Sequence, residues 1–312
     1  MKLSVIIPLL NEEDNIVPLY QRLKKTLDSL QCEYEIIFVN DGSSDTTEAK
    51  ILALREQDAR LKLLTFSRNF GHQIALTAGL DYASGDAVIT MDADLQHPPE
   101  VIPDMVARWK EGYPLVYSVR RSTDSGLLKR LMSSIFYRCF RLFSGITLPF
   151  YAADFRLMER RVVNAIRSLR EHTRFLRGLT YWTGYRSTAV SYDAPARNAG
   201  HTKYTPLRMM RLAIDAITSF SVAPLYLAIV AGIMCMTLGL FYFLFVFYAW
   251  YVTGHVLPGW TSLVVVILVI GGIQLLLMGV MGLYIATIYQ EVKARPLYIV
   301  DHAIGIDPAS NR

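Results

Sequence analysis

The sequence predicts an α/β protein, with a doubly wound and mostly parallel sheet followed by two C-terminal transmembrane helices. Short apolar runs that favour strands alternate with helix-like segments over roughly the first 120 residues, the pattern of a mostly parallel sheet. Asn, Asp, Ser and Pro cluster where these runs end. Farther along, no Asp, Glu, Lys or Arg occurs from Ala216 to Gln290, a stretch long enough for two membrane spans.

Composition and charge narrow the class of protein. The chain has 312 residues, of which 52% are hydrophobic, and its mean hydropathy of +0.27 is high for a soluble protein. Three widely spaced cysteines, Cys32, Cys139 and Cys235, favour reduced thiols over a disulfide framework or a zinc site. Strand-like residues directly follow Met1 and Lys2, so we expect no signal peptide. The net charge of +5 is modest, and we expect no nucleic-acid partner.

The N-terminal elements follow one another as strand, helix and strand. The first strand, Leu3–Ile7, is expected to end at Pro8, and Asn11 can cap a helix that runs to about Leu30. Turn-rich loops separate each later strand from the helix after it. These later elements are predicted as strand Ile36–Val39, a helix towards Asp58, strand Leu61–Phe66, a helix to about Tyr82 and strand Ala87–Met91.

The strand Ala87–Met91 leads into the most informative stretch of the chain. It is short and uncharged, as expected of a parallel strand buried on both faces. Asp92 and Asp94 follow it, and Gln96 comes two residues later. Ligands of open α/β sheets bind beyond the carboxyl ends of strands, and carboxylates at i and i+2 can share a divalent cation that also binds a diphosphate. A solvated turn is the alternative, since Asp is common after strands.

Three motifs at predicted strand ends together resemble glycosyltransferase family 2, which has the GT-A fold. They are Pro8–Glu12, Val39–Asp45 and Asp92–Gln96, and the resemblance covers roughly residues 1–220. It implies that Asp92, Asp94 and Gln96 hold Mg²⁺ or Mn²⁺ together with the diphosphate of a nucleotide sugar. It also implies nucleotide contacts from Pro8, Leu10, Asn11, Glu12, Asp41, Ser43, Asp92 and Ala93.

Other nucleotide-binding classes fit less well. Neither G-x-G-x-x-G nor G-x-x-x-x-G-K-[ST] occurs, which counts against dinucleotide oxidoreductases and P-loop NTPases. A carboxylate such as Asp41 can accept the hydrogen bonds that uracil N–H or ribose hydroxyl groups donate. A plain turn with a helix cap is the alternative for the stretch 41–43.

Two amphipathic stretches precede the long apolar region. Apolar residues recur every three or four positions in Gly126–Gly145, with Arg and Lys mostly on other faces. This pattern is typical of a basic helix that lies in a membrane interface, or of a surface helix packed on the sheet. Pro206–Phe220 is a second such stretch, and membrane contact is favoured there because it adjoins the apolar region.

The apolar region predicts two membrane spans, Leu225–Tyr251 and about Ser262–Tyr289. Each exceeds the roughly 20 residues that a helix needs to cross a bilayer. The short break between them has no Lys or Arg, whereas Arg and Lys flank the pair on its outer sides. The positive-inside rule therefore places both termini and the catalytic domain in the cytoplasm. A hairpin of buried core helices is the alternative.

Four further motifs resemble the bactoprenol glucosyltransferases, close relatives of dolichol-phosphate mannose synthase. They are Asp154–Met158, Ala199–Tyr204, Ile217–Ser221 and Arg295–Tyr298, so this resemblance extends over nearly the whole chain. It implies an inverting transfer of a hexose, usually glucose from UDP-glucose, to undecaprenyl phosphate. It also implies a multi-pass protein of the bacterial inner membrane, contact with membrane lipids and a homo-oligomer, since relatives form tetramers. The expected domains are the GT-A domain 1–205, the juxtamembrane helix 206–222, the transmembrane hairpin 223–290 and the cytoplasmic tail 291–312.

The resemblance also implies roles for individual charged residues. Arg120, Arg197 and Lys203 match positions that hold phosphates, a task that suits guanidinium and ammonium groups. Asp94, Asp154 and Arg120 are the expected catalytic residues. Because the acceptor phosphate is already an anion, we favour an orienting role for Asp154 over that of a base.

Some expectations leave simpler alternatives open. A helix N-cap before Phe155–Ile166 is the alternative for Asp154. The histidines show no metal-ligand spacing and are expected at the surface: His72, His97, His172 and His201.

Three rival functions remain open from the sequence. A relative could transfer mannose or an amino-arabinose derivative to the same lipid with nearly the same residues. A processive polysaccharide synthase should carry a Q-x-x-R-W motif, which does not occur here. A non-enzymatic membrane protein would tolerate loss of Asp92 and Asp94, yet both are present.

Overall fold

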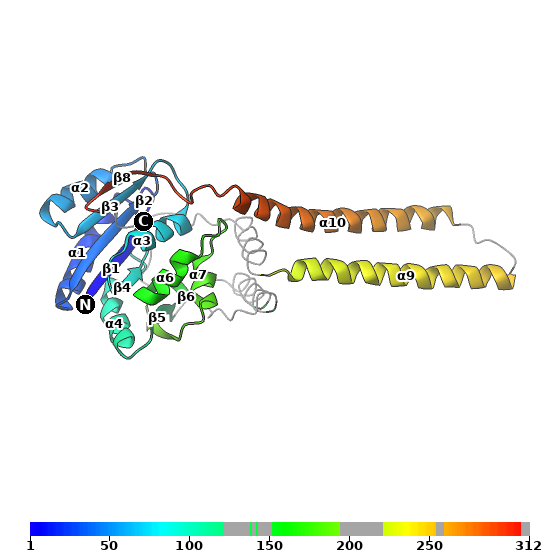
Figure 1. Cartoon of the computed structure of the whole chain (residues 1–312), viewed down its shortest axis with the longest axis horizontal. Coiled ribbons are helices and arrows are strands. Elements are labelled where there is room, and N and C mark those ends of the chain that lie inside the picture. Colours follow the sequence, from blue (N-terminus) through cyan, green and yellow to red (C-terminus); the bar gives the residue numbers. More distant parts are fainter. Residues whose placement is uncertain (122–137, 139–141, 143–151, 194–220, 254–258, 307–312) are drawn as a thin grey trace.

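The structure, a computed structural model, describes residues 1–121, 138, 142, 152–193, 221–253 and 259–306. It consists of an α/β domain from which two long helices, α9 and α10, project side by side (Figure 1). The predicted amphipathic stretch 206–220, most of 126–145, and the residues Arg197, His201 and Lys203 lie outside the described residues.

One mixed sheet forms the centre of the α/β domain. Its eight strands lie in the order β7-β5-β6-β4-β1-β2-β3-β8. The four strands β3, β2, β1 and β4 are mutually parallel, whereas β6 and β8 are antiparallel to their neighbours. The strands are β1 (Lys2–Leu9), β2 (Glu33–Asn40), β3 (Leu61–Phe66), β4 (Ala87–Thr90), β5 (Leu115–Arg120), β6 (Ala152–Glu159), β7 (Ser187–Tyr192) and β8 (Val300–Ile304).

Helices cover both faces of the sheet, which confirms the doubly wound prediction. Alternate side chains of β1 enter two separate cores: Val5 packs with α1, α2 and α4, and Ile6 packs with α3, α6 and α7. Gly79 of α3 lies so close to Ile6 that a Cβ there would be 2.2 Å from its Cγ2. The helices are α1 (Ile16–Ser29), α2 (Thr47–Gln57), α3 (His72–Tyr82), the short 3₁₀ helix η1 (Pro99–Val101), α4 (Ile102–Lys110), α6 (Arg160–Ser168) and α7 (Leu176–Trp182).

The strand order also fixes where a ligand can bind. The chain runs from β1 outward to β2 and β3, then returns to place β4 on the other side of β1. The crevice at the carboxyl ends of β1 and β4 is therefore the switch point at which open α/β sheets bind ligands. Both predicted motifs, Pro8–Glu12 and Asp92–Gln96, begin there.

The predicted end of the first strand was wrong. The strand continues through Pro8 to Leu9. Ile6 accepts a hydrogen bond from Met91 on the β4 side and Leu9 accepts one from Asp41 on the β2 side, so Pro8 faces the β4 side after that ladder has ended. Its missing N–H therefore costs no ladder bond.

Asn11 is not the cap of the first helix. The helix α1 begins later, at Ile16 after Asn15, while Asn11 adopts a left-handed conformation with φ 54°. Asn tolerates this conformation better than most residues, so the chain can turn here before the helix starts.

The two apolar helices are α9 (Ala223–Thr253) and α10 (Trp260–Val292). Both are long and apolar enough to cross a membrane, over Ala223–Val252 and Val269–Val292, and neither of these spans is buried against the rest of the protein. This observation contradicts the buried-hairpin alternative. The predicted spans were slightly shorter than the helices at both ends.

After α10 the chain returns to the α/β domain and docks on it. His172, which precedes α7, lies with Nδ1 2.9 Å from Glu291 Oε2 and Nε2 2.8 Å from the Arg295 carbonyl oxygen. Tyr298 stacks on Phe66 and donates a hydrogen bond of 2.8 Å to Asp81. The strand β8 then extends the sheet beside β3. This last strand was not predicted from the sequence.

The contact between His172 and the end of α10 predicts a pH-dependent stability. Its hydrogen bonds to Glu291 and to the Arg295 carbonyl raise the pKa of His172 above its usual 6.5, because both partners are acceptors and the imidazolium can donate to both. A raised pKa contributes stability that is complete below about pH 6.5 and is lost as the pH rises through the folded-state value. We expect the melting temperature of the wild type to fall more between pH 6 and pH 8.5 than the melting temperature of His172→Gln. Equal pH dependence of the two proteins would contradict this assignment.

Candidate active site

The loops after β1 and β2 are joined by hydrogen bonds. Asn11 donates its backbone N–H to Ser43 Oγ (3.0 Å), and its Oδ1 accepts from the Ser44 N–H (2.8 Å). The Ser43 N–H donates to Asn40 Oδ1 (2.9 Å), and the Glu12 N–H donates to Thr47 Oγ1. The structure thus brings together the predicted nucleotide residues Pro8, Leu10, Asn11, Glu12, Asp41 and Ser43 at one edge of the sheet.

Asp41 holds a third loop at this edge. Its side chain is buried, and its two oxygens accept the backbone N–H groups of Phe70 (2.6 Å) and Gly71 (2.9 Å) between β3 and α3. Burial raises the pKa of this carboxyl, although the two N–H donors oppose the effect. Gly42 has φ +74°, and a Cβ there would be 2.8 Å from the backbone of Arg68. Asp41 therefore organises the loop, and its contact with a nucleotide stays a prediction.

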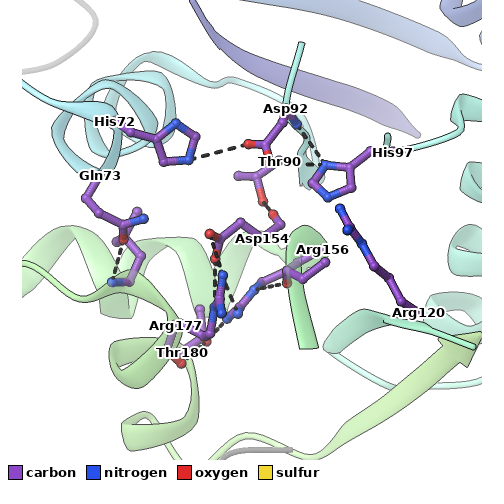
Figure 2. Close-up of polar contacts among 12 residues, drawn as sticks. His72, Gln73, Thr90, Asp92, His97, Arg120, Asp154, Arg156, Arg177 and Thr180 are labelled. Carbon is purple, nitrogen blue, oxygen red and sulfur yellow. Dashed lines mark hydrogen bonds and ion pairs between the residues drawn. The ribbon is translucent and has the colours of Figure 1, made fainter. Parts of the chain in front are cut away.

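Asp92 lies at the end of β4 between two histidines (Figure 2). Its Oδ1 is 3.4 Å from His72 Nε2, at the first turn of α3. Its backbone N–H donates to His97 Nδ1 at 3.0 Å. Leu95, in the same loop, is buried with φ 61°, a strained conformation for a leucine of the kind found at functional sites.

His97 is buried, so its predicted surface position was wrong. Its ring stacks on Phe155 at 5.3 Å and meets Tyr192 edge-on. Burial lowers the pKa of His97, and Nδ1 accepts the Asp92 N–H, so the ring is neutral with its proton on Nε2. The 3.6 Å approach of Asp92 Oδ2 to Nδ1 is accordingly not an ion pair.

Arg120 connects the far side of this loop to β7. It comes from the end of β5 and donates to Gln96 Oε1 (2.9 Å) and to the Tyr192 hydroxyl (3.1 Å). Gln96 and Arg120, predicted to contact metal and phosphate, thus lie side by side. A carbonyl oxygen has two lone pairs, so Gln96 Oε1 can still accept another contact.

The residues at the end of β4 fit a divalent cation. Within the part of the chain that the structure describes, Asp92 Oδ1 is buried and makes no hydrogen bond, with His72 Nε2 3.4 Å away. A buried carboxylate oxygen that lacks a hydrogen bond is costly unless a cation or donor approaches it. Asp94 Oδ1 accepts the Gln96 N–H at 3.2 Å. Among the described residues, no three His, Cys, Asp or Glu side chains form a metal cluster. Mg²⁺ needs fewer, since it commonly takes one or two carboxylates and fills its other positions with water and phosphate oxygen.

Asp154 forms a second charged centre, and its carboxylate points towards Arg177 and Arg156 (Figure 2). Arg177 from α7 grips both carboxylate oxygens, with Nε–Oδ1 at 3.1 Å and Nη2–Oδ2 at 2.8 Å, and Arg156 Nη2 lies 3.6 Å from Oδ1. Burial alone would raise the pKa of Asp154, but Arg177 and Arg156 outweigh it and hold the pKa far below its usual range. A carboxylate so stabilised is a poor base. Asp154 lies within β6, so the helix-cap alternative was wrong.

A hydrogen bond between neighbouring strands links Asp154 to Thr90, the last residue of the strand that precedes Asp92. Thr90 Oγ1 donates to the Asp154 carbonyl at 2.6 Å, between neighbouring strands β4 and β6. Beside it lies a cavity of about 10 Å³ that Asp154, Arg156 and Thr180 line together with apolar side chains. This volume suits about one water molecule, so the cavity is not a sugar site.

Five residues were not predicted from the sequence to belong to this site: His72, His97, Arg156, Arg177 and Tyr192. His172, predicted at the surface, is also partly buried and bonded to Glu291. The position of His97 directly after Gln96 was the one available signal. The others come from α3, β6, α7 and β7, and only the fold brings these elements together.

Comparison with known proteins bears on the family of the chain. The model of the family described as Glycosyl transferase family 2 matches residues 4–167. The chain is 46% identical to the uncharacterized glycosyltransferase YkcC of Bacillus subtilis, over 97% of this chain and 94% of that one. It is 41% identical to the SfII prophage-derived bactoprenol glucosyl transferase of Shigella flexneri, over 96% and 97% of the two chains.

A solved structure shares the fold of the α/β domain. Glucosyl-3-phosphoglycerate synthase from Mycobacterium tuberculosis, in complex with Mn²⁺, UDP-glucose and phosphoglyceric acid, matches with a TM-score of 0.50 and 21% identity. The match covers 70% of this chain and 77% of that one, and it supports the predicted GT-A fold. The family model and the curated relatives lead to one conclusion: the chain belongs to glycosyltransferase family 2.

Proposed function

We propose that the protein transfers glucose from UDP-glucose to undecaprenyl phosphate, with inversion, on the cytoplasmic face of a bacterial inner membrane. The observation that carries this proposal is the 41% identity, over 96% of the chain, to a protein named bactoprenol glucosyl transferase. The helices α9 and α10 support it, because they would hold the α/β domain at the membrane in which such a lipid lies.

The donor would bind at the carboxyl ends of β1, β2 and β4. The loops tied together by Asn11, Ser43 and Asp41 would hold the nucleoside, with Pro8, Leu10, Glu12 and Ala93 beside them. Asp92, Asp94 and Gln96 would hold Mg²⁺ or Mn²⁺, which offsets negative charge on the diphosphate. The synthase of similar fold was solved with Mn²⁺ and UDP-glucose, in accord with such a site.

The reaction needs one displacement. An oxygen of the lipid phosphate attacks the anomeric carbon opposite the UDP group, the bond from that carbon to the diphosphate oxygen breaks, and UDP leaves with the bonding electrons. The attacking phosphate is already an anion, so no proton has to be removed. Asp154, kept ionised by Arg177, would orient the sugar or its acceptor. Arg120 would hold phosphate, with Arg197 and Lys203 completing the set of cations.

Charge asymmetry supports the proposed orientation in the membrane. The predicted break between the spans lacks Lys and Arg, whereas Arg208, Arg211, Lys293 and Arg295 lie on the outer sides of the pair. The positive-inside rule then places the α/β domain and both termini in the cytoplasm, where nucleotide sugars are made. We also propose that the protein forms a homo-oligomer, with the domain limits 1–205, 206–222, 223–290 and 291–312. Residues 300–304 of the last unit complete the sheet of the first.

Sealed membrane vesicles of both orientations test activity and sidedness together. Inside-out and right-side-out vesicles with the protein are given undecaprenyl phosphate and a panel of UDP-glucose, GDP-mannose and a UDP-linked amino-arabinose derivative. Because nucleotide sugars do not cross the bilayer, we expect mass spectrometry to find glucosylated undecaprenyl phosphate from UDP-glucose in inside-out vesicles only.

The controls separate the parts of the proposal. Vesicles without the protein should give no product, and detergent should make both orientations equally active. Product from another sugar would replace the proposed donor and keep the acceptor. Product in right-side-out vesicles would reverse the orientation, and the absence of any lipid product would contradict the proposed function.

A further inference from the structure

The strand β8, which follows the membrane helices in sequence, lies close to the loop proposed to hold the donor nucleoside. It pairs antiparallel with β3, and His302 stands opposite Thr65 in this pairing. The side chain of His302 reaches across β3 to the first turn of α2, where its Nε2 lies 2.8 Å from Glu48 Oε1. Its Nδ1 lies 3.0 Å from Oδ2 of Asp301.

Both neighbours of the His302 ring are carboxylates, which accept hydrogen bonds and do not donate them. Only the imidazolium can donate from both ring nitrogens, so this geometry requires the charged form. The hydrogen bond to Asp301 and the charge and hydrogen bond of Glu48 raise the pKa of His302, in agreement with that requirement. The contact with Glu48 is therefore a charge-assisted hydrogen bond, of the stronger kind.

Glu48 also forms a hydrogen bond to β2. Its other oxygen, Oε2, accepts hydrogen bonds from Asn40 Nδ2 (2.9 Å) and Thr65 Oγ1 (3.1 Å). Asn40 is buried at the last position of β2. Because the amide nitrogen of Asn40 is held by Glu48, its Oδ1 points to the following turn and accepts the Ser43 N–H.

The hydrogen bonds form an unbroken series from the C-terminal strand to the proposed donor site. It runs from His302 to Glu48, Asn40, Ser43 and Asn11. Glu48, Asn40 and Ser43 each bond to the member before and the member after them, so a change at one end alters the constraint on the next. Such contiguous polar contacts can carry a coupling between sites, and double-mutant cycles measure it.

We propose that His302 is a positioning residue for the donor nucleotide, acting through Glu48 and Asn40 on the turn after β2. The proposal rests on the proposed function, because it takes that turn as part of the UDP site. It gives the segment after α10 a role beyond anchoring: the donor site is fully ordered only when β8 is docked on β3.

The test is the affinity of the full-length protein in detergent for UDP in the presence of Mn²⁺, measured by titration calorimetry. We expect His302→Ala to weaken UDP binding roughly threefold to tenfold, which lies within the range of measured couplings of this kind. His302→Gln, whose amide can still donate to Glu48, should recover most of the affinity. In turnover assays the KM for UDP-glucose should rise with the same factor, while kcat and the KM for the lipid stay nearly constant.

His172→Ala is the matched control. It removes the other histidine that holds the segment after α10, yet the described partners of His172 are Glu291 and Arg295, and neither belongs to the series that leads to the turn after β2. We expect UDP affinity to change by less than twofold in this variant, with folding of every variant checked by thermal unfolding. Equal weakening by His172→Ala would mean that general docking of the segment matters, which would overturn a specific role for His302.

A double-mutant cycle tests the route through Glu48. If His302 acts through that carboxylate, Glu48→Ala and the double variant Glu48→Ala/His302→Ala should bind UDP equally well, so that the two effects are not additive. Additive effects, or an unchanged affinity of His302→Ala, would overturn the inference and leave the proposed function intact. A wild-type protein that binds no UDP would overturn the proposed donor, and this inference with it.

Discussion

Replacing Asp94 with Asn should abolish nearly all turnover while leaving the fold intact. The substitution keeps the shape of the side chain and removes a negative charge from the loop after β4. In that loop Asp92 Oδ1 is buried and makes no hydrogen bond to any residue that the structure describes. A bound divalent cation is worth several kcal/mol of charge stabilisation in such reactions, so we expect kcat/KM to fall by about 10³-fold or more. Product formation with UDP-glucose, followed by mass spectrometry of the lipid, measures the loss.

Metal binding provides a second readout that does not depend on turnover. Electron paramagnetic resonance should detect Mn²⁺ bound to the wild type with UDP, and much less bound to Asp94→Asn. EDTA should inactivate the wild type, and added Mg²⁺ or Mn²⁺ should restore it. Asp104→Asn, at an exposed position of α4, is the matched control and should change neither quantity. Full activity of Asp94→Asn in excess EDTA would falsify the metal assignment.

The parallel half of the fold was predictable because its strands are buried on both faces. Such strands appear in the sequence as continuous apolar runs, and the strand Leu61–Phe66 was predicted with the bounds that the structure has. The strand β6 gave no such signal, since Asp154, Arg156 and Glu159 interrupt it with charge. In the fold, Arg177 and Thr180 contact the first two of these residues, so the charges are tolerated.

The residues of the site likewise divide into those that a local motif predicts and those that only the fold brings together. The motif residues Asp92, Asp94 and Gln96 were found because a short local pattern carries them. His97 was predicted at the surface. Its burial could not be predicted from the local sequence, because it depends on Phe155 and Tyr192, which come from strands far away in the sequence. The same holds for β8: its pairing joins Leu63 to Ile304, and no local periodicity predicts a partner at that distance.

The pairing of Asp154 with Arg177 supports the second large effect. Asp154 is mostly buried, with 15% of its side chain exposed, and Arg177 donates to both of its oxygens. Removing Arg177 leaves the buried carboxylate with the more distant Arg156, whose Nη2 lies 3.6 Å from Oδ1, and breaking a buried pair typically costs about 3–5 kcal/mol. We therefore expect Arg177→Ala to lower the melting temperature strongly, whereas Arg161→Ala, which removes an exposed pair with Glu159, should cost less than about 1 kcal/mol.

A double variant separates the structural role of this pair from its role in the reaction. Asp154→Asn/Arg177→Gln removes both charges and keeps similar shapes, so most of the lost stability should return. Activity should stay about 10²-fold or more below the wild type, because the anionic side chain that orients the sugar or its acceptor is still absent. Asp154 keeps its carboxylate ionised far below neutral pH, so the wild-type rate should show no titration of this residue between pH 5 and 9. If the double variant recovers activity together with stability, the pair only supports the fold, and the catalytic assignment of Asp154 is wrong.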